Sequence, residues 1–168
     1  MRCISNKRKF NIQRKIILVN LQIGSVMKMS IKWKDGVSFL GEAESGHSVL
    51  MDGAPEIGGK NLGLRPMEMV LMGAGGCTAL DVVMILKRGR QEIVDCMVDI
   101  EAERATEEPK IFTRIHYHFI LTGNNLKPEK VERAINLSAE KYCSASIMLG
   151  KTAIISHDYE ILGDSPSC

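Results

Sequence analysis

Cys77 follows two glycines in the most apolar stretch of this 168-residue chain, a setting that suits thiol chemistry. A glycine pair weakens a helix, so we predict that Cys77 begins a new helical segment. At a helix N-terminus, free backbone N–H groups and the positive end of the dipole stabilise a thiolate, the nucleophilic form of cysteine. Cys77 is therefore a candidate nucleophile. The alternative, a small buried residue where two elements cross closely, stays open.

Cys143 is a second candidate thiol, 66 residues further along the chain. It lies between a predicted helix and a short helical piece at 145–149, where backbone N–H groups are again available. Ser144 and Ser146 beside it carry hydroxyls that can hydrogen-bond to a sulfur. Two cysteines at helix junctions suggest an attacking thiol and a resolving thiol. Coincidence is the alternative, because sequence alone cannot bring the two within disulfide reach.

Glu68 is a third candidate, because it is a carboxylate in the first turn of an otherwise apolar helix that Pro66 opens. A carboxylate in this position either stabilises the helix dipole or belongs to a functional site. The sequence leaves both roles open.

His116 and His118 share one face of a predicted strand with Arg114. Two imidazoles at this spacing could bind a metal. Such a face more often lies in solvent and pairs with acidic side chains of the neighbouring strand. We therefore predict no metal here and expect pairing with Asp99, Glu101 and Glu103.

The segment after residue 27 has the pattern of a meander of short strands. Ile31 and Trp33 alternate with lysines, and Asp35-Gly36 is a strong signal for a two-residue hairpin. We expect further strands at 37–43 and 47–51, followed by a glycine-rich loop at 52–63.

The central helix predicted from Pro66 is apolar on nearly every face, since only Glu68, Thr78 and Asp81 are clearly polar between residues 67 and 86. Such a helix must be covered on nearly every face, and one small sheet covers only one side. We therefore predict a second covering layer, which a partner subunit would supply. No membrane span is expected, because each flanking carboxylate would cost about 2.5–3.5 kcal/mol in the middle of a bilayer.

Period-2 patterns at 96–103 and 111–121 predict the two long strands of a half-buried hairpin. Pro128 opens a second helix, whose apolar residues recur at helical spacing as far as Tyr142. Residues 152–162 have the pattern of a last strand.

Composition and charge indicate a soluble globular protein, with 25% charged and 45% hydrophobic residues. Residues 1–27 hold six of the cations and no acid, which leaves the rest of the chain with a net charge of −4. We predict a disordered or non-native extension at 1–27, one domain at 28–162 and a loose tail at 163–168. The mildly acidic domain gives no nucleic-acid footprint. Five irregularly spaced cysteines and no secretion signal indicate a reducing, cytoplasmic setting.

Three motifs together resemble the OsmC/Ohr family, most of all its short YhfA-type members. The motifs are Pro66-Met67-Glu68-Met69-Val70-Leu71, Gly75-Gly76-Cys77-Thr78-Ala79-Leu80-Asp81 and Ser138-Ala139-Glu140-Lys141-Tyr142-Cys143-Ser144. The resemblance covers about residues 28–162. It implies an α+β fold in which antiparallel sheets wrap around central helices in an intertwined homodimer.

The same resemblance implies a thiol-dependent peroxidase that acts mainly on organic hydroperoxides in oxidative-stress defence. Cys77 would be the peroxidatic thiolate and Cys143 the resolving thiol, with Glu68 nearby and an external dithiol as reductant. The resemblance implies neither a metal nor a bound organic cofactor.

Two departures from the peroxidase members keep other functions open. Those members carry Glu directly after the proline of the first motif, where this chain has Met67. They also carry an Arg before that proline, which activates the thiol, whereas residues 37–64 of this chain contain no Arg. A non-catalytic dimer that binds a small apolar or acyl ligand is the main alternative. Acyl transfer on Cys77, with a histidine such as His47 or His157, is the other.

Overall fold

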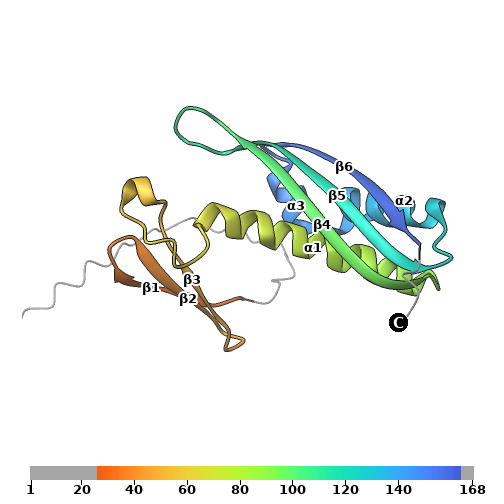
Figure 1. Ribbon diagram of the computed structural model, residues 1–168, viewed down its shortest axis with the longest axis horizontal. Helices are drawn as coiled ribbons and strands as arrows, with labels where there is room; N and C mark the ends of the chain where they lie inside the picture. Colours follow the sequence, from red (N-terminus) through yellow and green to blue (C-terminus); the bar gives the residue numbers. More distant parts are fainter. Residues whose placement is uncertain (1–25, 164–168) are drawn as a thin grey trace, which may run out of the picture.

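The computed structural model describes residues 26–163, which form two small sheets and a long central helix (Figure 1). The first sheet has the order β1-β2-β3 and the second the order β4-β5-β6. This confirms the α+β class. Most of the predicted extension and tail, including Cys3 and Cys168, lie outside the described residues.

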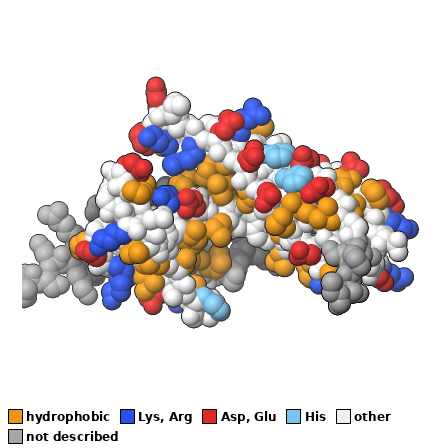
Figure 2. All heavy atoms as spheres, in the orientation of Figure 1, with side chains coloured by type: hydrophobic (Ala, Val, Ile, Leu, Met, Phe, Trp, Pro, Cys, Tyr) orange, Lys and Arg blue, Asp and Glu red, His pale blue; other side chains and the backbone are white. Residues whose placement is uncertain are grey.

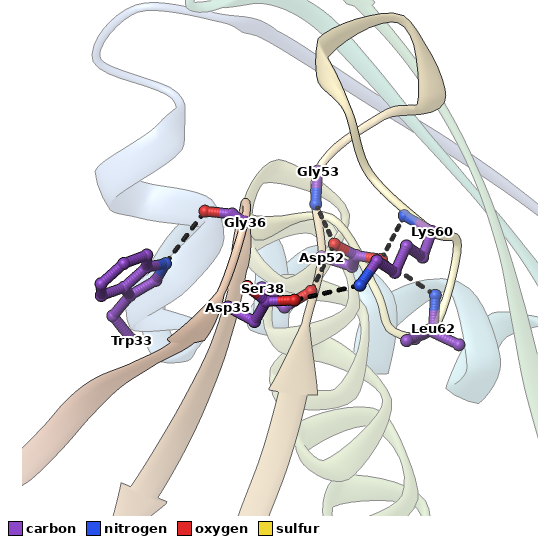
Figure 3. Close-up of polar contacts among 8 residues, drawn as sticks. All are labelled: Trp33, Asp35, Gly36, Ser38, Asp52, Gly53, Lys60 and Leu62. Atoms are coloured by element: carbon purple, nitrogen blue, oxygen red, sulfur yellow. Dashed lines mark hydrogen bonds and ion pairs between the residues drawn. The ribbon is translucent and has the colours of Figure 1, made fainter.

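The first sheet is the predicted meander of β1 (Met29–Asp35), β2 (Ser38–Ala43) and β3 (Ser48–Met51), all antiparallel. The turn between β1 and β2 contains Gly36 at φ +53°, a backbone conformation that favours glycine. The Trp33 indole N–H donates to the Gly36 carbonyl at 2.9 Å and closes this turn (Figure 3). The Asp35-Gly36 hairpin signal is thus confirmed.

The loop after β3, which includes the 3₁₀ turn η1 (Pro55–Ile57), is organised around one buried carboxylate (Figure 3). Asp52 is 1% exposed. It accepts hydrogen bonds from the Ser38 hydroxyl at 2.8 Å and from the backbone N–H groups of Gly53, Lys60 and Leu62 at 2.8–3.1 Å. These bonds, led by those from Leu62 and Ser38, lower the pKa of Asp52 to about 2. The loop therefore depends on this side chain remaining ionised.

Replacing this carboxylate is expected to destabilise the protein in a pH-dependent way. Asp52→Asn removes an acceptor from a set of four donors, so we expect the thermal unfolding midpoint at pH 7 to fall by about 5 °C or more. Because the folded-state pKa lies below the ordinary value of 3.8, the carboxylate stabilises the fold above that pH and ceases to do so as pH falls towards 2.

Melting curves of the wild type and Asp52→Asn at pH 7 and pH 3 measure this effect, and the gap in midpoint should narrow at pH 3. Asp35→Asn is the matched control, because Asp35 is exposed and pairs with Lys60 at the surface. It should change the midpoint little. A gap for Asp52→Asn that is equal at both pH values would show that the charge is not what matters.

The central helix α1 (Pro66–Arg88) runs without a break through both glycines, so the predicted new helix start at Cys77 is wrong. A Cβ at Gly75 would collide with the Ile100 side chain of β4, whereas a Cβ at Gly76 would meet nothing within 4 Å. Gly75 thus lets α1 approach the second sheet closely. Packing on that sheet outweighs the low helix propensity of glycine.

The second sheet contains the predicted hairpin of β4 (Glu92–Arg104) and β5 (Phe112–Asn124), followed by β6 (Ile154–Leu162). The hairpin is antiparallel, but β5 and β6 are parallel, so the prediction of purely antiparallel sheets is wrong for this sheet. The chain returns between these two strands through helices, and such a crossover allows a parallel partner.

The helices of that crossover lie with α1 on one face of the second sheet (Figure 1). They are α2 (Pro128–Leu137), the π-helical turn η2 (Ser138–Tyr142) and α3 (Ser144–Leu149). The core lies between them and β5, and its largest buried side chains include Phe119, Leu86 and Ile115. α1 is long and apolar enough to span a membrane by composition, yet Val82 and Leu86 are buried in this core.

One face of α1 is left uncovered. Its apolar side chains Val70, Met72, Leu80 and Met84 are exposed, with Leu80 at 63%. Trp33 of the first sheet is equally exposed, at 63%. Hydrophobic atoms gather in the middle of the face in Figure 2, between the first sheet and the second. A single chain therefore lacks the second covering layer that the sequence predicts.

Candidate functional site

Cys77 occupies the middle of α1, on a turn that faces the C-terminal helices. The backbone N–H groups of the helix interior are used in i→i−4 bonds, so they do not stabilise a thiolate here. The Cys77 side chain is partly exposed. The structure therefore offers this sulfur access from outside but not the helix terminus that the sequence analysis assigned to it.

Cys143 takes the helix-terminal position instead. It is the N-cap of α3, and its sulfur accepts the Ser146 N–H at 3.4 Å. The thiol also donates to the Ser146 hydroxyl at 3.2 Å. The prediction that backbone N–H groups become available at Cys143 is confirmed, with Ser146 as the partner. The side chain is 0% exposed.

The two sulfurs meet because the π-helical turn η2 ends against α1. The sulfurs of Cys77 and Cys143 and a carboxylate oxygen of Asp81 lie within 4.8 Å of one another. Asp81 follows Cys77 by one helical turn, and residues at i and i+4 share a helix face. The site therefore combines two thiols with one acid.

Burial raises the pKa of the Cys143 thiol, because the charged form is desolvated. The two hydrogen bonds with Ser146 act in the opposite direction, and the adjacent Cys77 raises the pKa further. Cys143 is thus held mainly as a protonated thiol beside the more accessible sulfur.

A chain of hydroxyls fixes Asp81. The Ser138 hydroxyl donates to Asp81 Oδ2 at 3.2 Å and lies 2.9 Å from Thr78 Oγ1. Because the single proton of Ser138 goes to Asp81, Thr78 is the donor in the second bond. Ser138 and Thr78 are buried, so this chain ties α1 to η2 beside the two sulfurs.

Glu68 lies in the first turn of α1 and caps the helix. It accepts the Arg65 N–H at 2.9 Å and pairs with the Arg65 guanidinium at 3.5 Å. Nine residues separate it from Cys77, about 13 Å along the helix axis. Within one chain, the structure thus gives Glu68 the dipole-stabilising role and does not bring it to the thiols.

The histidines contact polar groups away from the sulfurs. His118 pairs with Asp158 of β6 at 2.5 Å and His116 with the same carboxylate at 3.4 Å. The predicted pairing with β4 is confirmed for Arg114, whose guanidinium lies 3.8 Å from Glu103, and Asp99 and Glu101 lie opposite His118 and His116 in the strand register. The hydrogen bond to Asp158 raises the pKa of His118. His157 contacts Asn136 at 3.0 Å, and His47 contacts Ser45 at 3.3 Å.

Cys96 of β4 provides an internal reference thiol. Burial, and then the charge of Asp95, raise its pKa to about 11. A thiol with such a pKa stays protonated near neutral pH and reacts slowly. It is therefore a matched control for the two cysteines of the site.

A pocket of about 400 Å³ opens beside Asp81. Its polar groups come from Asp81, Arg88 and the Tyr142 hydroxyl. The rest of the wall is apolar and consists of Leu80, Met84, Ile85 and Leu137. It borders the uncovered face of α1.

Sequence reasoning did not assign Asp81, Ser138 or Tyr117 to the site. The i, i+4 spacing from Cys77 could have identified Asp81. Tyr117 of β5 is 2% exposed, and its hydroxyl has no hydrogen-bond partner among the described residues. Burial raises its pKa most, the nearby Ser146 hydroxyl lowers it, and Cys143 and Cys77 raise it further, which places Tyr117 in their neighbourhood.

Comparison with known proteins identifies the family of this chain. The family model described as OsmC-like protein matches residues 58–158. Protein YhfA of Escherichia coli K12 is 54% identical over 139 residues, which cover 81% of this chain and 98% of that protein. The chain belongs to the OsmC-like protein family.

Solved structures agree with the OsmC-like fold. A hypothetical protein from Aquifex aeolicus matches with a TM-score of 0.74 at 27% identity, covering 84% of this chain and 100% of that one. An organic hydroperoxide resistance protein OsmC from Legionella pneumophila matches with a TM-score of 0.64 at 15% identity, covering 81% and 97%. Most of the described residues therefore share the OsmC-like architecture.

Proposed function

We propose that this OsmC-like protein reduces organic hydroperoxides with a dithiol and so serves in defence against oxidative stress. The observation that carries this proposal is the approach of Cys77 and Cys143, whose sulfurs lie within 4.8 Å although they come from different helices. A disulfide needs the sulfurs at about 2.05 Å, so a modest closure joins them.

The chemistry has three steps. The Cys77 thiolate attacks the outer peroxide oxygen, the O–O bond breaks, and Cys77 becomes a sulfenic acid, while the alkoxide leaves and takes a proton from water to form the alcohol. The Cys143 thiol then attacks the sulfenic sulfur, which forms the disulfide and releases water. An external dithiol reduces the disulfide by exchange and is itself oxidised.

The difference in exposure supports an order for the two thiols. Cys77 is partly exposed, whereas Cys143 is 0% exposed and held as a thiol by Ser146. A peroxide reaches the accessible sulfur first, and the buried one lies ready beside it. This supports Cys77 as the peroxidatic residue and Cys143 as the resolving residue.

The substrate class rests on the family. The Legionella pneumophila relative is named for organic hydroperoxide resistance, while the name of the Escherichia coli relative, Protein YhfA, states no activity. The apolar pocket beside Asp81 suits the organic part of such a peroxide.

The working form in this proposal is a homodimer in which a second copy covers the open face of α1. Exposed Met72, Leu80 and Met84 form this face, and Gly73 and Gly76 leave room for close approach, because a Cβ on either would meet nothing within 4 Å. An uncovered apolar surface of this kind marks an interaction site. The cytoplasm, with its reducing dithiols, is the matching location.

A non-catalytic, ligand-binding dimer is the second candidate, and Asp81 is the observation that favours it. Asp81 places an acidic group within 4.8 Å of both sulfurs, where the resemblance to the peroxidases would require a cation. Residues 37–64 also lack the Arg that resemblance to the peroxidases would require. In this alternative the pocket beside Asp81 holds a small apolar or acyl ligand.

Steady-state turnover separates the two functions. The reduced protein is mixed with tert-butyl hydroperoxide or hydrogen peroxide and an excess of dithiothreitol, and peroxide loss is followed over time. The proposal predicts catalytic turnover, faster with the organic peroxide, that Cys96→Ser leaves within about twofold. Peroxide loss no faster than with dithiothreitol alone would favour the ligand-binding dimer.

A further inference from the structure

Cys77, Asp81 and Cys143 form a donor set as well as a redox pair. Thiolates and carboxylates are established ligands of Zn²⁺. Two of the three donors lie one helical turn apart on α1, and the third comes from the N-cap of α3. The fold thus brings together ligands from distant parts of the chain, and no local sequence motif predicts this set.

The spacing fits a tetrahedral ion. Zn–S bonds of about 2.3 Å and Zn–O bonds of about 2.0–2.2 Å place neighbouring ligand atoms roughly 3.4–3.8 Å apart. In this structure all three ligand atoms lie within 4.8 Å of one another. A contraction of at most about 1.4 Å between any two of these atoms brings them to bonding positions.

The surroundings resemble the outer shell of a metal site. Ligating carboxylates are commonly oriented by a hydrogen bond, and Ser138 donates one to Asp81 at 3.2 Å. The Ser146 N–H at 3.4 Å likewise directs the Cys143 sulfur. Both partners belong to the crossover helices, so the positions of the ligands depend on the fold and not on flexible loops.

The Tyr117 hydroxyl is an independent sign of a missing partner. It is buried at 2% exposure of the residue and has no hydrogen-bond partner among the described residues. A buried unpaired hydroxyl costs free energy, so native structures seldom leave one unexplained. Ser146, Cys143 and Cys77 are the groups that act on this hydroxyl, so a water on an ion at this site would supply its partner.

We propose that the reduced protein binds one Zn²⁺ through Cys77, Asp81 and Cys143, with a fourth position open to water. Binding converts two thiols to thiolates and releases two protons. It excludes the disulfide, because a Cys77–Cys143 bond would remove both thiolate ligands. Zn²⁺ thereby protects the reduced pair. The site uses the thiols of the proposed function, but it does not depend on hydroperoxide turnover.

Metal titration tests this proposal directly. Reduced, metal-free protein is titrated with ZnCl₂ against a chromophoric chelator, and separately with Co²⁺ to record thiolate-to-metal charge transfer and tetrahedral d–d absorption. We expect about one ion per chain, with both cobalt bands present. Cys77→Ser and Cys143→Ser should lose the site, and Asp81→Asn should lower the affinity at least about tenfold.

Cys96→Ser is the matched control and should bind like the wild type, since Cys96 lies outside the donor set. Circular dichroism establishes that each variant is folded. As a second measurement on the wild type, Zn²⁺ should slow alkylation of Cys77 and Cys143 and leave that of Cys96 unchanged. Binding that survives Cys77→Ser, affinity unchanged in Asp81→Asn, or no binding by the wild type would overturn the proposal.

Discussion

Cys77→Ser is expected to lower kcat/KM for an organic hydroperoxide on the order of 10³-fold or more. The sulfur is the atom that attacks the peroxide, and a serine hydroxyl is not ionised near neutral pH and does not form a sulfenic acid. Loss of a nucleophile typically removes most of the rate enhancement of an enzyme. The measurement is dithiol-dependent peroxide consumption at several substrate concentrations.

Two companion variants make this result specific. Cys143→Ser should lose steady-state turnover yet still react once, leaving a sulfenic acid on Cys77 that dimedone traps and mass spectrometry detects. Cys96→Ser should turn over normally, because its pKa of about 11 keeps that thiol protonated. If Cys77→Ser retained the wild-type rate, Cys77 would have no place in the mechanism.

Leu80→Asp is expected to convert the proposed dimer to monomers. Leu80 is among the most exposed apolar side chains on α1, and the proposal places it under the partner. An unpaired carboxylate buried at an interface costs several kcal/mol, so the dimer dissociation constant should rise at least about 100-fold. Light scattering across a concentration series measures the mass of the species in solution.

The control for this change is Lys130→Asp, which places the same carboxylate on the exposed face of α2. It should remain dimeric. Leu80→Ala serves if Leu80→Asp does not fold, with a smaller rise in the dissociation constant. A wild type that is monomeric at all concentrations would show that the protein does not dimerise. A dimer that Leu80→Asp leaves intact would show that the subunits associate through another surface.

Periodicity and turn residues predicted most of the fold. The meander, the central helix, the long hairpin and the last strand all lie where alternation or helical spacing placed them, because local patterning and burial agree there. Ile31 and Trp33, for example, alternate with lysines and lie in β1. The capping position of Cys143 was also predictable, since it depends on a local helix junction.

Non-local contacts explain the errors. Gly75 would favour a helix break in isolation, but the close approach of Ile100 keeps α1 continuous, and no local pattern reports that contact. The parallel pairing of β5 with β6 depends on the path of the chain through three helical segments. Tyr117 reaches the neighbourhood of the thiols only because its strand lies under them.

The candidate site was therefore predictable in its sulfurs and not in its electrostatics. The two cysteines were identified by helix-junction arguments and family resemblance, and the structure brings them together. The reason given for Cys77 was wrong, because the stabilising N–H groups are found at Cys143. Asp81 and its hydroxyl chain give the site a charge environment that depends on the packing of η2 on α1.

The most direct test of the account is to map the cysteine pairing after one equivalent of organic hydroperoxide. Reduced, metal-free protein is oxidised, alkylated without reduction and digested, and the peptides are identified by mass spectrometry. We expect a single Cys77–Cys143 disulfide within one chain, with Cys96 alkylated as a free thiol. Oxidation that leaves Cys77 and Cys143 unpaired, or joins either to another cysteine, would contradict it.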